Sequence, residues 1–324
     1  MSTSKKEAGL TVSPLDPAKV AAKVAAEIIA STRGKSDKDA EEKDSLEKKK
    51  TTRSGNFITI GDTFVVESGN YAILERNIKK QVNTLLLGPT GVGKTELVAN
   101  IAQSLGLPLT IFDMGTMSDP IMSLIGSHVV SIKDGVTYSE FRKSRFSEVI
   151  QQPGIVLLDE LSRASVSANN ILFPCLDFRR ELCMEYCFED TTPIPVHPEC
   201  VFIATANLGS QYTGTHKLDR ALIDRFMIMQ IDPLPNDQIK LVLTALHPEI
   251  SETIINKVVA CYSEINKAHD TFQISFNLSL RHLKMITALI EDNFTMYDAF
   301  YVTCKGIGGD DGIKAIKSLL DTVK

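Results

Sequence analysis

A glycine-rich loop between an apolar run and a helical pattern constrains this chain more than any other feature. The loop reads G-P-T-G-V-G-K-T, follows residues 83–87 and precedes a helical pattern over 96–104. Glycines let the backbone curl so that successive N–H groups point at phosphate oxygens, and the helix adds its positive N-terminal end. Strand, loop and helix in this order are the context that a phosphate-binding loop requires. We therefore predict a nucleotide site formed by Gly88, Pro89, Thr90, Gly91, Val92, Gly93, Lys94 and Thr95.

Side chains at two places would complete such a site. We expect Lys94 to neutralise the β- and γ-phosphates and Thr95 to offer its hydroxyl to Mg²⁺. A second apolar run, 155–158, ends in Asp159 and Glu160. Asp159 can hold Mg²⁺ through water, and Glu160 can polarise the water that attacks the γ-phosphate. The sequence thus predicts ATP and Mg²⁺ as cofactors, although a solvated acidic turn would explain the two acids if the loop were absent.

A third apolar run, 201–206, ends in Asn207. An uncharged amide can orient water near a γ-phosphate without adding negative charge there. We therefore predict that Asn207 positions the attacking water. An isolated asparagine would more often form a turn, so this interpretation depends on its place at the end of a third strand.

The spacing of apolar runs predicts the fold class. Continuous apolar strands joined by long crossovers imply a parallel sheet covered on both faces. After 233–235 the pattern becomes helical throughout. We therefore expect an α/β core with a five-stranded parallel sheet and then a small all-helical domain. The strands are expected at 85–87, 109–112, 155–158, 201–204 and 226–229, and the helices at 236–247, 251–269, 279–292, 296–305 and 312–323.

The first 54 residues differ in composition from the rest of the chain. They contain no aromatic residue and 12 Lys and Arg against 9 Asp and Glu, a net +3, whereas the remainder is 23 − 31 = −8. Residues 35–53 cannot bury enough apolar surface to offset their ordering entropy. We expect 1–54 to be a flexible tail, with one amphipathic helix that either docks or stays detached. Residues 55–235 would form the nucleotide-binding core and 236–324 the helical domain.

Composition and charge exclude several classes. With 43% hydrophobic and 23% charged residues the chain is not collagen-like, wholly disordered or a disulfide scaffold. It has no apolar run long enough for a membrane span, so we expect a cytoplasmic protein without a membrane partner. The net charge of −5 argues against coating nucleic acid by charge alone.

We expect the cysteines to be reduced and structural. A metal site at Cys183 and Cys187 is the less favoured alternative, and no histidine has metal-ligand spacing.

The motifs in their order resemble those of an AAA+ ATPase over residues 56–293. They are the phosphate loop, the tandem acids, the strand-terminal asparagine, L-D-R-A-L-I-D-R-F at 218–226 and S-L-R at 279–281. The segment D-E-L-S-R-A at 159–164, Phe141 with Arg142, and two expected hairpins resemble the MoxR-like branch more narrowly. That branch includes cobaltochelatase small-subunit-type and gas-vesicle N-type ATPases, and relatives occur in phage genomes. The resemblance implies the three-layer AAA+ core followed by a helical lid.

The resemblance also assigns roles to individual residues. Lys94 and Thr95 match Walker A, Asp159 and Glu160 match Walker B, and Asn207 matches sensor 1. Arg225 matches the arginine finger, which reaches into the neighbouring subunit's nucleotide. A surface arginine paired with Asp224 or Asp219 is the alternative, and Arg220 is a second finger candidate. Arg281 matches sensor 2, although Leu280 stands where this branch often has proline.

Two hairpins are expected to form the working surface. Residues 124–142 alternate around Lys-Asp-Gly, which is a hairpin turn signal, and residues 181–200 form the second candidate. In the MoxR-like branch such hairpins contact clients or the pore. Structural hairpins with solvated tips are the alternative. Tyr71 lies where the family approaches adenine, although a core or hinge aromatic is the simpler interpretation.

The resemblance implies a ring, expected to be a hexamer, that remodels a protein client, often beside a partner with a von Willebrand factor A domain. The first 54 residues lack the folded leader of the cobaltochelatase subunit, whereas 212–217 resemble the gas-vesicle type. A nucleic-acid motor or loader with the same core is the alternative function, and nucleic acid is the less favoured partner. Its expected basic contacts would be Lys133, Arg142, Lys143 and Arg145. A non-hydrolysing scaffold is disfavoured because Glu160 and Arg225 are both present.

Overall fold

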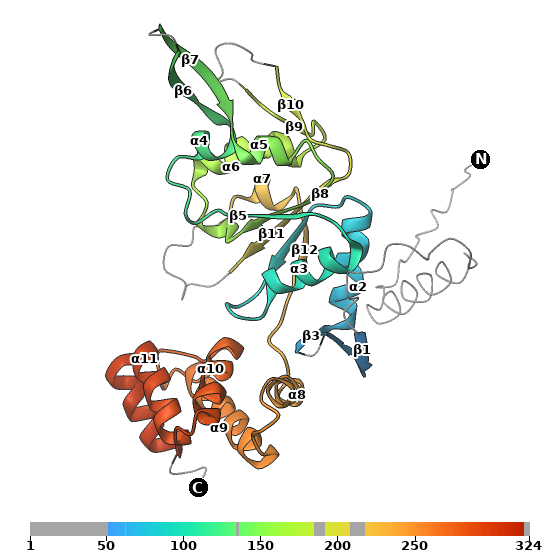
Figure 1. Cartoon of the computed structure of the whole chain (residues 1–324). Coiled ribbons are helices and arrows are strands. Elements are labelled where there is room, and N and C mark those ends of the chain that lie inside the picture. The colour runs from blue at the N-terminus through green and yellow to red at the C-terminus, as the bar shows by residue number, and fades with distance from the viewer. Residues whose placement is uncertain (1–50, 62, 134–135, 185–191, 208–217, 321–324) are drawn as a thin grey trace, which may run out of the picture. The chain divides into compact units, whose positions relative to one another are not determined.

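The computed structural model describes residues 51–61, 63–133, 136–184, 192–207 and 218–320 (Figure 1). Contacts divide the chain into two compact units, Met1–Glu47 and Lys48–Lys324. The first unit, which contains the expected N-terminal helix, lies outside the described residues. The expected core and lid both lie within the second unit.

A five-stranded parallel sheet forms the centre of the core, as the sequence predicts (Figure 1). Every neighbouring pair in it runs parallel. In this arrangement the carboxyl ends of the strands meet at one edge of the sheet. The strand order is β12 (Met227–Gln230), β4 (Thr84–Leu87), β11 (Cys200–Ala206), β8 (Gly154–Asp159) and β5 (Leu109–Asp113).

Helices cover both faces of this sheet. Alternate residues of β8 and β11 enter two different buried clusters, because successive side chains of a strand point to opposite faces. Val156 and Phe202 pack with Phe146, whereas Ile155 and Val201 lie in the cluster of the other face. The core therefore has three layers. Its helices are α2 (Ser68–Lys79), α3 (Lys94–Leu105), α4 (Pro120–Leu124), α5 (Arg145–Val149), α6 (Val166–Leu176) and α7 (Arg220–Ile223).

A small antiparallel sheet precedes the core and corrects one expected boundary. It consists of β1 (Thr51–Ser54), β2 (Phe57–Ile60) and β3 (Phe64–Glu67). We expected residues 51–54 to belong to the tail, yet they form β1 and pair with β2 across a two-residue turn. The sequence of β1, T-T-R-S, has no apolar pattern, so only its pairing with β2 identifies it as a strand.

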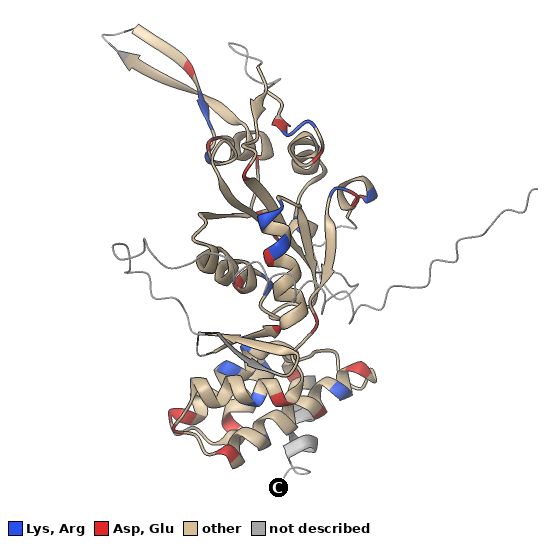
Figure 2. Ribbon diagram, turned by 90° about the vertical axis from the view of Figure 1, so that its right-hand side faces the viewer, with Lys and Arg blue, Asp and Glu red and all other residues tan. Residues whose placement is uncertain are grey.

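The first expected hairpin is confirmed. Strands β6 (Gly126–Lys133) and β7 (Val136–Lys143) pair antiparallel over their full length. Its apolar side chains Val130, Ile132 and Tyr138 are exposed. The charged residues of β7 lie in its second half, towards the base of the hairpin (Figure 2).

The second expected hairpin is present in part. Strands β9 (Glu181–Leu182) and β10 (Ile194–Pro195) pair antiparallel. Residues 185–191, which include its expected tip and Cys187, lie outside the described part of the chain. The gas-vesicle-like stretch 212–217 also lies outside it.

The C-terminal region is helical and has its own buried core. Residues Val258, Leu283, Ile286 and Phe300 belong to one cluster there. The expected helices after 296 form a single element that breaks at Gly309, where φ is 55° and ψ is −135°. The four elements are α8 (Asn236–Leu246), α9 (Glu252–Asp270), α10 (Leu280–Glu291) and α11 (Met296–Leu320).

Ser279 is the N-cap of α10, and the first residue of the helix, Leu280, is the one that stands where a proline was expected. A capping box joins the Ser279 side chain to the third residue of the helix, His282, whose Nδ1 accepts from the Ser279 N–H at 3.1 Å. Although Leu280 replaces the expected proline, the capping box therefore defines where this helix begins. Within the described ranges, every helix is too short or too polar to span a bilayer.

Candidate nucleotide-binding site

The phosphate loop connects β4 to α3 and requires glycine at two positions for different reasons. A Cβ at Gly88 would lie 2.2 Å from the carbonyl oxygen of Ile231, which follows β12. Gly91 has a φ of +82°, and a Cβ there would lie 2.9 Å from the Cβ of Ser279 at the start of α10. The loop therefore fits closely against both the sheet and the lid.

Lys94, the first residue of α3, is 8% exposed and its ammonium has three acceptors. Its Nζ donates to the carbonyl oxygens of Gly88 and Pro89, at 2.8 and 2.9 Å, and to Asn207 Oδ1 at 2.7 Å. The structure thus brings together two residues that are 113 positions apart, one at the start of α3 and one directly after β11. Burial lowers the pKa of Lys94 to about 8, although Asp159 and Glu160 act to raise it.

The side chains of Thr95 and Asp159, both expected to hold Mg²⁺, also lie in contact. The Thr95 hydroxyl lies 3.0 Å from Asp159 Oδ1 and 3.2 Å from Oδ2. A hydroxyl and a carboxylate are hard oxygen donors that suit Mg²⁺. The described residues contain no cluster of three His, Cys, Asp or Glu side chains that could hold a metal. This donor set fits an ion that binds one or two protein groups and completes its shell with phosphates and water.

Thr205 is a site residue that the sequence analysis missed. It is 2% exposed, its hydroxyl donates to Asp159 Oδ1 at 2.5 Å, and it accepts from the Glu160 N–H at 3.0 Å. The available signal was the period of two along a strand, which places residue 205 on the same face of β11 as Asn207.

Glu160 leaves the strand in a left-handed conformation, with φ 55° and ψ 42°, and precedes the short 3₁₀ helix η1 (Leu161–Arg163). Its Oε2 forms an ion pair with Arg163 Nε at 3.0 Å. Arg163 packs in turn against the loop after β5, where a Cβ at Gly115 would lie 3.1 Å from the Arg163 Cδ. The expected base is therefore at the site, and its carboxylate is engaged by a neighbouring cation.

A cavity of about 560 Å³ joins these groups to the lid. This volume is in the usual range for a small-molecule site. Arg281, the expected sensor 2 residue, lines the cavity, and so does Lys284 one turn later on α10, which the sequence analysis did not single out. The apolar part of the cavity lining includes Phe64, Val65, Leu234 and Val242. Tyr71 instead has its hydroxyl 3.1 Å from Ser104 Oγ.

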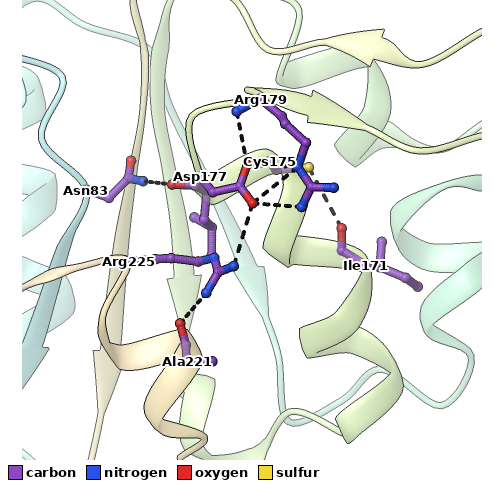
Figure 3. Close-up of polar contacts among 8 residues, drawn as sticks. Asn83, Ile171, Cys175, Asp177, Arg179, Ala221 and Arg225 are labelled. Atoms are coloured by element: carbon purple, nitrogen blue, oxygen red, sulfur yellow. Dashed lines mark hydrogen bonds and ion pairs between the residues drawn. The ribbon is translucent and has the colours of Figure 1, made fainter.

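Arg225 is held elsewhere in the same chain (Figure 3). Its Nη2 lies 3.6 Å from Asp177 Oδ2 and its Nη1 donates to the Ala221 carbonyl oxygen, while the guanidinium lies 4.6 Å from the Phe173 ring centroid. The partner is thus Asp177 rather than Asp224 or Asp219. Arg179 also binds Asp177 at 2.7 Å, and this hydrogen bond, with a smaller contribution from Arg225, holds the pKa of Asp177 below its usual range. Arg225 does not line the cavity described above.

Comparisons with known proteins identify the class of domain to which this chain is similar. Residues 83–226 match the family described as the AAA domain of the dynein-related subfamily. "Putative chaperone BssE" of Thauera aromatica is 37% identical over 161 residues, which cover 49% of this chain and 53% of BssE. Midasin of Dictyostelium discoideum is 31% identical over 175 residues, 54% of this chain and 3% of midasin. The family match and these relatives support an AAA+ ATPase.

The chain spans about half the length of BssE and a small part of midasin. The matches therefore concern one domain rather than the whole of either relative, and the MoxR-like branch remains a prediction. Among solved structures, NtrX from Brucella abortus in complex with ADP has a TM-score of 0.47 and 16% sequence identity, over 68% of this chain and 48% of NtrX.

The lowered pKa of Lys94 predicts a pH dependence of ATP affinity. Only the ammonium form attracts phosphate, and this form is lost as the pH rises through about 8. The affinity should therefore fall by up to about tenfold for each pH unit above that value. Binding of a fluorescent ATP analogue, followed from pH 7 to about 9.5, measures this. Lys94→Arg is the control, because the guanidinium stays charged over this range. The affinity of this variant for the ATP analogue should therefore not vary with pH. A flat curve for the unaltered protein would contradict the assignment of Lys94 as the phosphate cation.

Proposed function

We propose that this chain is a Mg²⁺-dependent ATPase of the MoxR-like branch, which hydrolyses ATP to remodel a protein partner. The observation that carries the proposal is two hydrogen-bonded pairs at the carboxyl ends of three strands. Lys94 pairs with Asn207 and Thr95 pairs with Asp159, beside a cavity that Glu160 and Arg281 also line. Ligands of open parallel sheets bind at this edge.

Each residue has a role that follows from its position. Lys94 would exchange one of its present acceptors for a phosphate oxygen, and Arg281 and Lys284 would meet the phosphates from the lid side. Thr95 and Asp159 would hold Mg²⁺, which neutralises the charge that develops on the phosphates. Asn207 would orient the attacking water through its amide without adding charge.

Glu160 would accept the proton of that water. Its carboxylate is within 3.0 Å of Arg163, so it must leave this ion pair or share it before it can act as a base. Arg163 contacts the loop at Gly115, which leads towards α4 and the β6–β7 hairpin. This chain of contacts offers a route by which a client at the hairpin could alter the activity of Glu160.

The proposed assembly is a ring, with six subunits as the expected number, in which Arg225 serves the neighbouring site. Arg225 lies away from the cavity of its own chain and its Nε is buried without a hydrogen bond. Head-to-tail contacts that supply a residue in trans form closed rings when the rotation closes. In this proposal Asp177 holds the guanidinium until the neighbour's phosphates replace it.

The exposed apolar side chains of the β6–β7 hairpin favour a protein client, with a von Willebrand factor A domain as the expected partner. Arg142 is paired with Glu140 at 3.3 Å, which reduces the positive charge available to nucleic acid. A motor or loader function would instead depend on Lys143 and Arg145, which are exposed. The proposal includes a cytoplasmic location.

The Glu160→Gln variant tests the reaction. Glutamine keeps the shape of the side chain but cannot accept the proton, so ATP should still bind while turnover falls by about 10²-fold or more. Phosphate release and binding of a fluorescent ATP analogue measure the two effects separately. Glu249→Gln, at an exposed position of the lid, is the matched control and should behave as the unaltered protein. Turnover of Glu160→Gln close to that of the control would remove Glu160 as the base.

Mixed assemblies test the shared site. Lys94→Ala and Arg225→Ala should each be inactive, but mixing them should restore part of the hydrolysis, because some interfaces then combine an intact Lys94 with a neighbour's intact Arg225. Mixing Lys94→Ala with Glu160→Gln is the control, since both defects lie within one chain's site and no interface becomes complete. If no mixing ratio of the first pair restored activity, Arg225 would not act in trans.

A further inference from the structure

We propose that Thr205 is a positioning residue that fixes both acids of the site, Asp159 for the metal and Glu160 for the water. The inference rests on the proposed ATPase function and extends it to a residue within a buried strand. It follows from the direction of two hydrogen bonds at a single hydroxyl.

The Thr205 hydroxyl has one proton and can donate only once. The Glu160 N–H can act only as a donor, so at 3.0 Å it must give its proton to Thr205 Oγ1. The Thr205 proton therefore points to Asp159 Oδ1, 2.5 Å away. One side chain thus links the carboxylate of the first acid to the backbone of the second.

The strand that carries Thr205 makes this link rigid. β11 lies between β4 and β8 in the sheet, and Ala204 pairs with Leu158 directly before the two acids. Thr205 is 2% exposed, so water cannot easily replace its hydroxyl. A β-branched side chain in a strand also has restricted rotation about χ1. Asn207, which directly follows β11, meets Lys94, so this one strand positions partners for both Lys94 and Asp159.

Loss of this hydroxyl would affect both acids at once. Asp159 would keep its hydrogen bond from the Thr95 hydroxyl, but that hydroxyl is expected to turn towards Mg²⁺. The Asp159 carboxylate would then lose the Thr205 donor that fixes its orientation. The Glu160 N–H would lose its acceptor at a residue whose φ of 55° is uncommon outside glycine. Both changes alter catalysis and the response to Mg²⁺ more than they alter contact with the nucleotide itself.

Thr205→Val is the direct test because it replaces the hydroxyl with a methyl group of similar size. We expect the affinity for a fluorescent ATP analogue at saturating Mg²⁺ to stay within about twofold, while kcat falls by about tenfold or more. The Mg²⁺ concentration for half-maximal binding of the analogue should rise by about tenfold, which a charged hydrogen bond of ordinary strength can supply. Thr205→Ser restores the hydroxyl and should return both quantities to within about threefold of the unaltered protein.

Thr84→Val is the matched control. Thr84 is also fully buried in the sheet, and its hydroxyl donates to the Val82 carbonyl oxygen and accepts from Asn77. This variant should lower the melting temperature as Thr205→Val does, without changing kcat or the Mg²⁺ response. If Thr205→Val does not fold, Thr205→Ala removes the same hydroxyl without adding a methyl group.

Three results would overturn the inference. These are a kcat and Mg²⁺ response of Thr205→Val equal to those of the unaltered protein, a failure of Thr205→Ser to restore them, or an equal effect in Thr84→Val. If the unaltered protein binds ATP but does not hydrolyse it, the proposed function fails. The Mg²⁺ dependence of binding then still decides whether Thr205 positions Asp159.

Discussion

The Asp159 carboxylate is the group around which the rest of the site is arranged. It accepts hydrogen bonds from Thr95 at the start of α3 and from Thr205 within β11, so it joins three elements that are distant in sequence. The carboxyl edge of a parallel sheet favours such a meeting, because strand ends and helix beginnings converge there. The neighbouring Lys94 and Asn207 use the same edge. The strand order β4–β11–β8 therefore determines which side chains can cooperate.

Two further groups act on this edge from outside the sheet. The lid reaches it through Ser279 at Gly91 and through Arg281 and Lys284 in the cavity, so movement of α10 would change both the loop and the charge around the phosphates. Arg225 is different, because Asp177 and Phe173 hold it away from its own cavity. A monomer thus lacks this cation at its site, and the proposed neighbour is the source that would complete it.

The sequence predicted the parts of the molecule whose signals are local. The five strands were visible as apolar runs, and the phosphate loop and tandem acids were visible as motifs next to them. The strand β1 was not predicted, because its pairing with β2 gives it order that its own polar residues do not indicate. Thr205 lies within a buried run, where only the period of two along the strand marks it. Asp177 lies 48 positions before Arg225, so their pairing has no sequence pattern. The left-handed backbone of Glu160, whose N–H donates to the Thr205 hydroxyl, likewise has no sequence pattern.

The central claim is that Lys94, Thr95 and Asp159 hold a metal-bound nucleotide at this edge of the sheet. A crystal structure with a non-hydrolysable ATP analogue and Mn²⁺, whose anomalous scattering locates the ion, tests it most directly. The account predicts an anomalous peak beside Thr95 Oγ1 and the Asp159 carboxylate, with the β- and γ-phosphates within hydrogen-bond distance of Lys94 Nζ. A nucleotide bound elsewhere, or an ion with no contact to either residue, would contradict it.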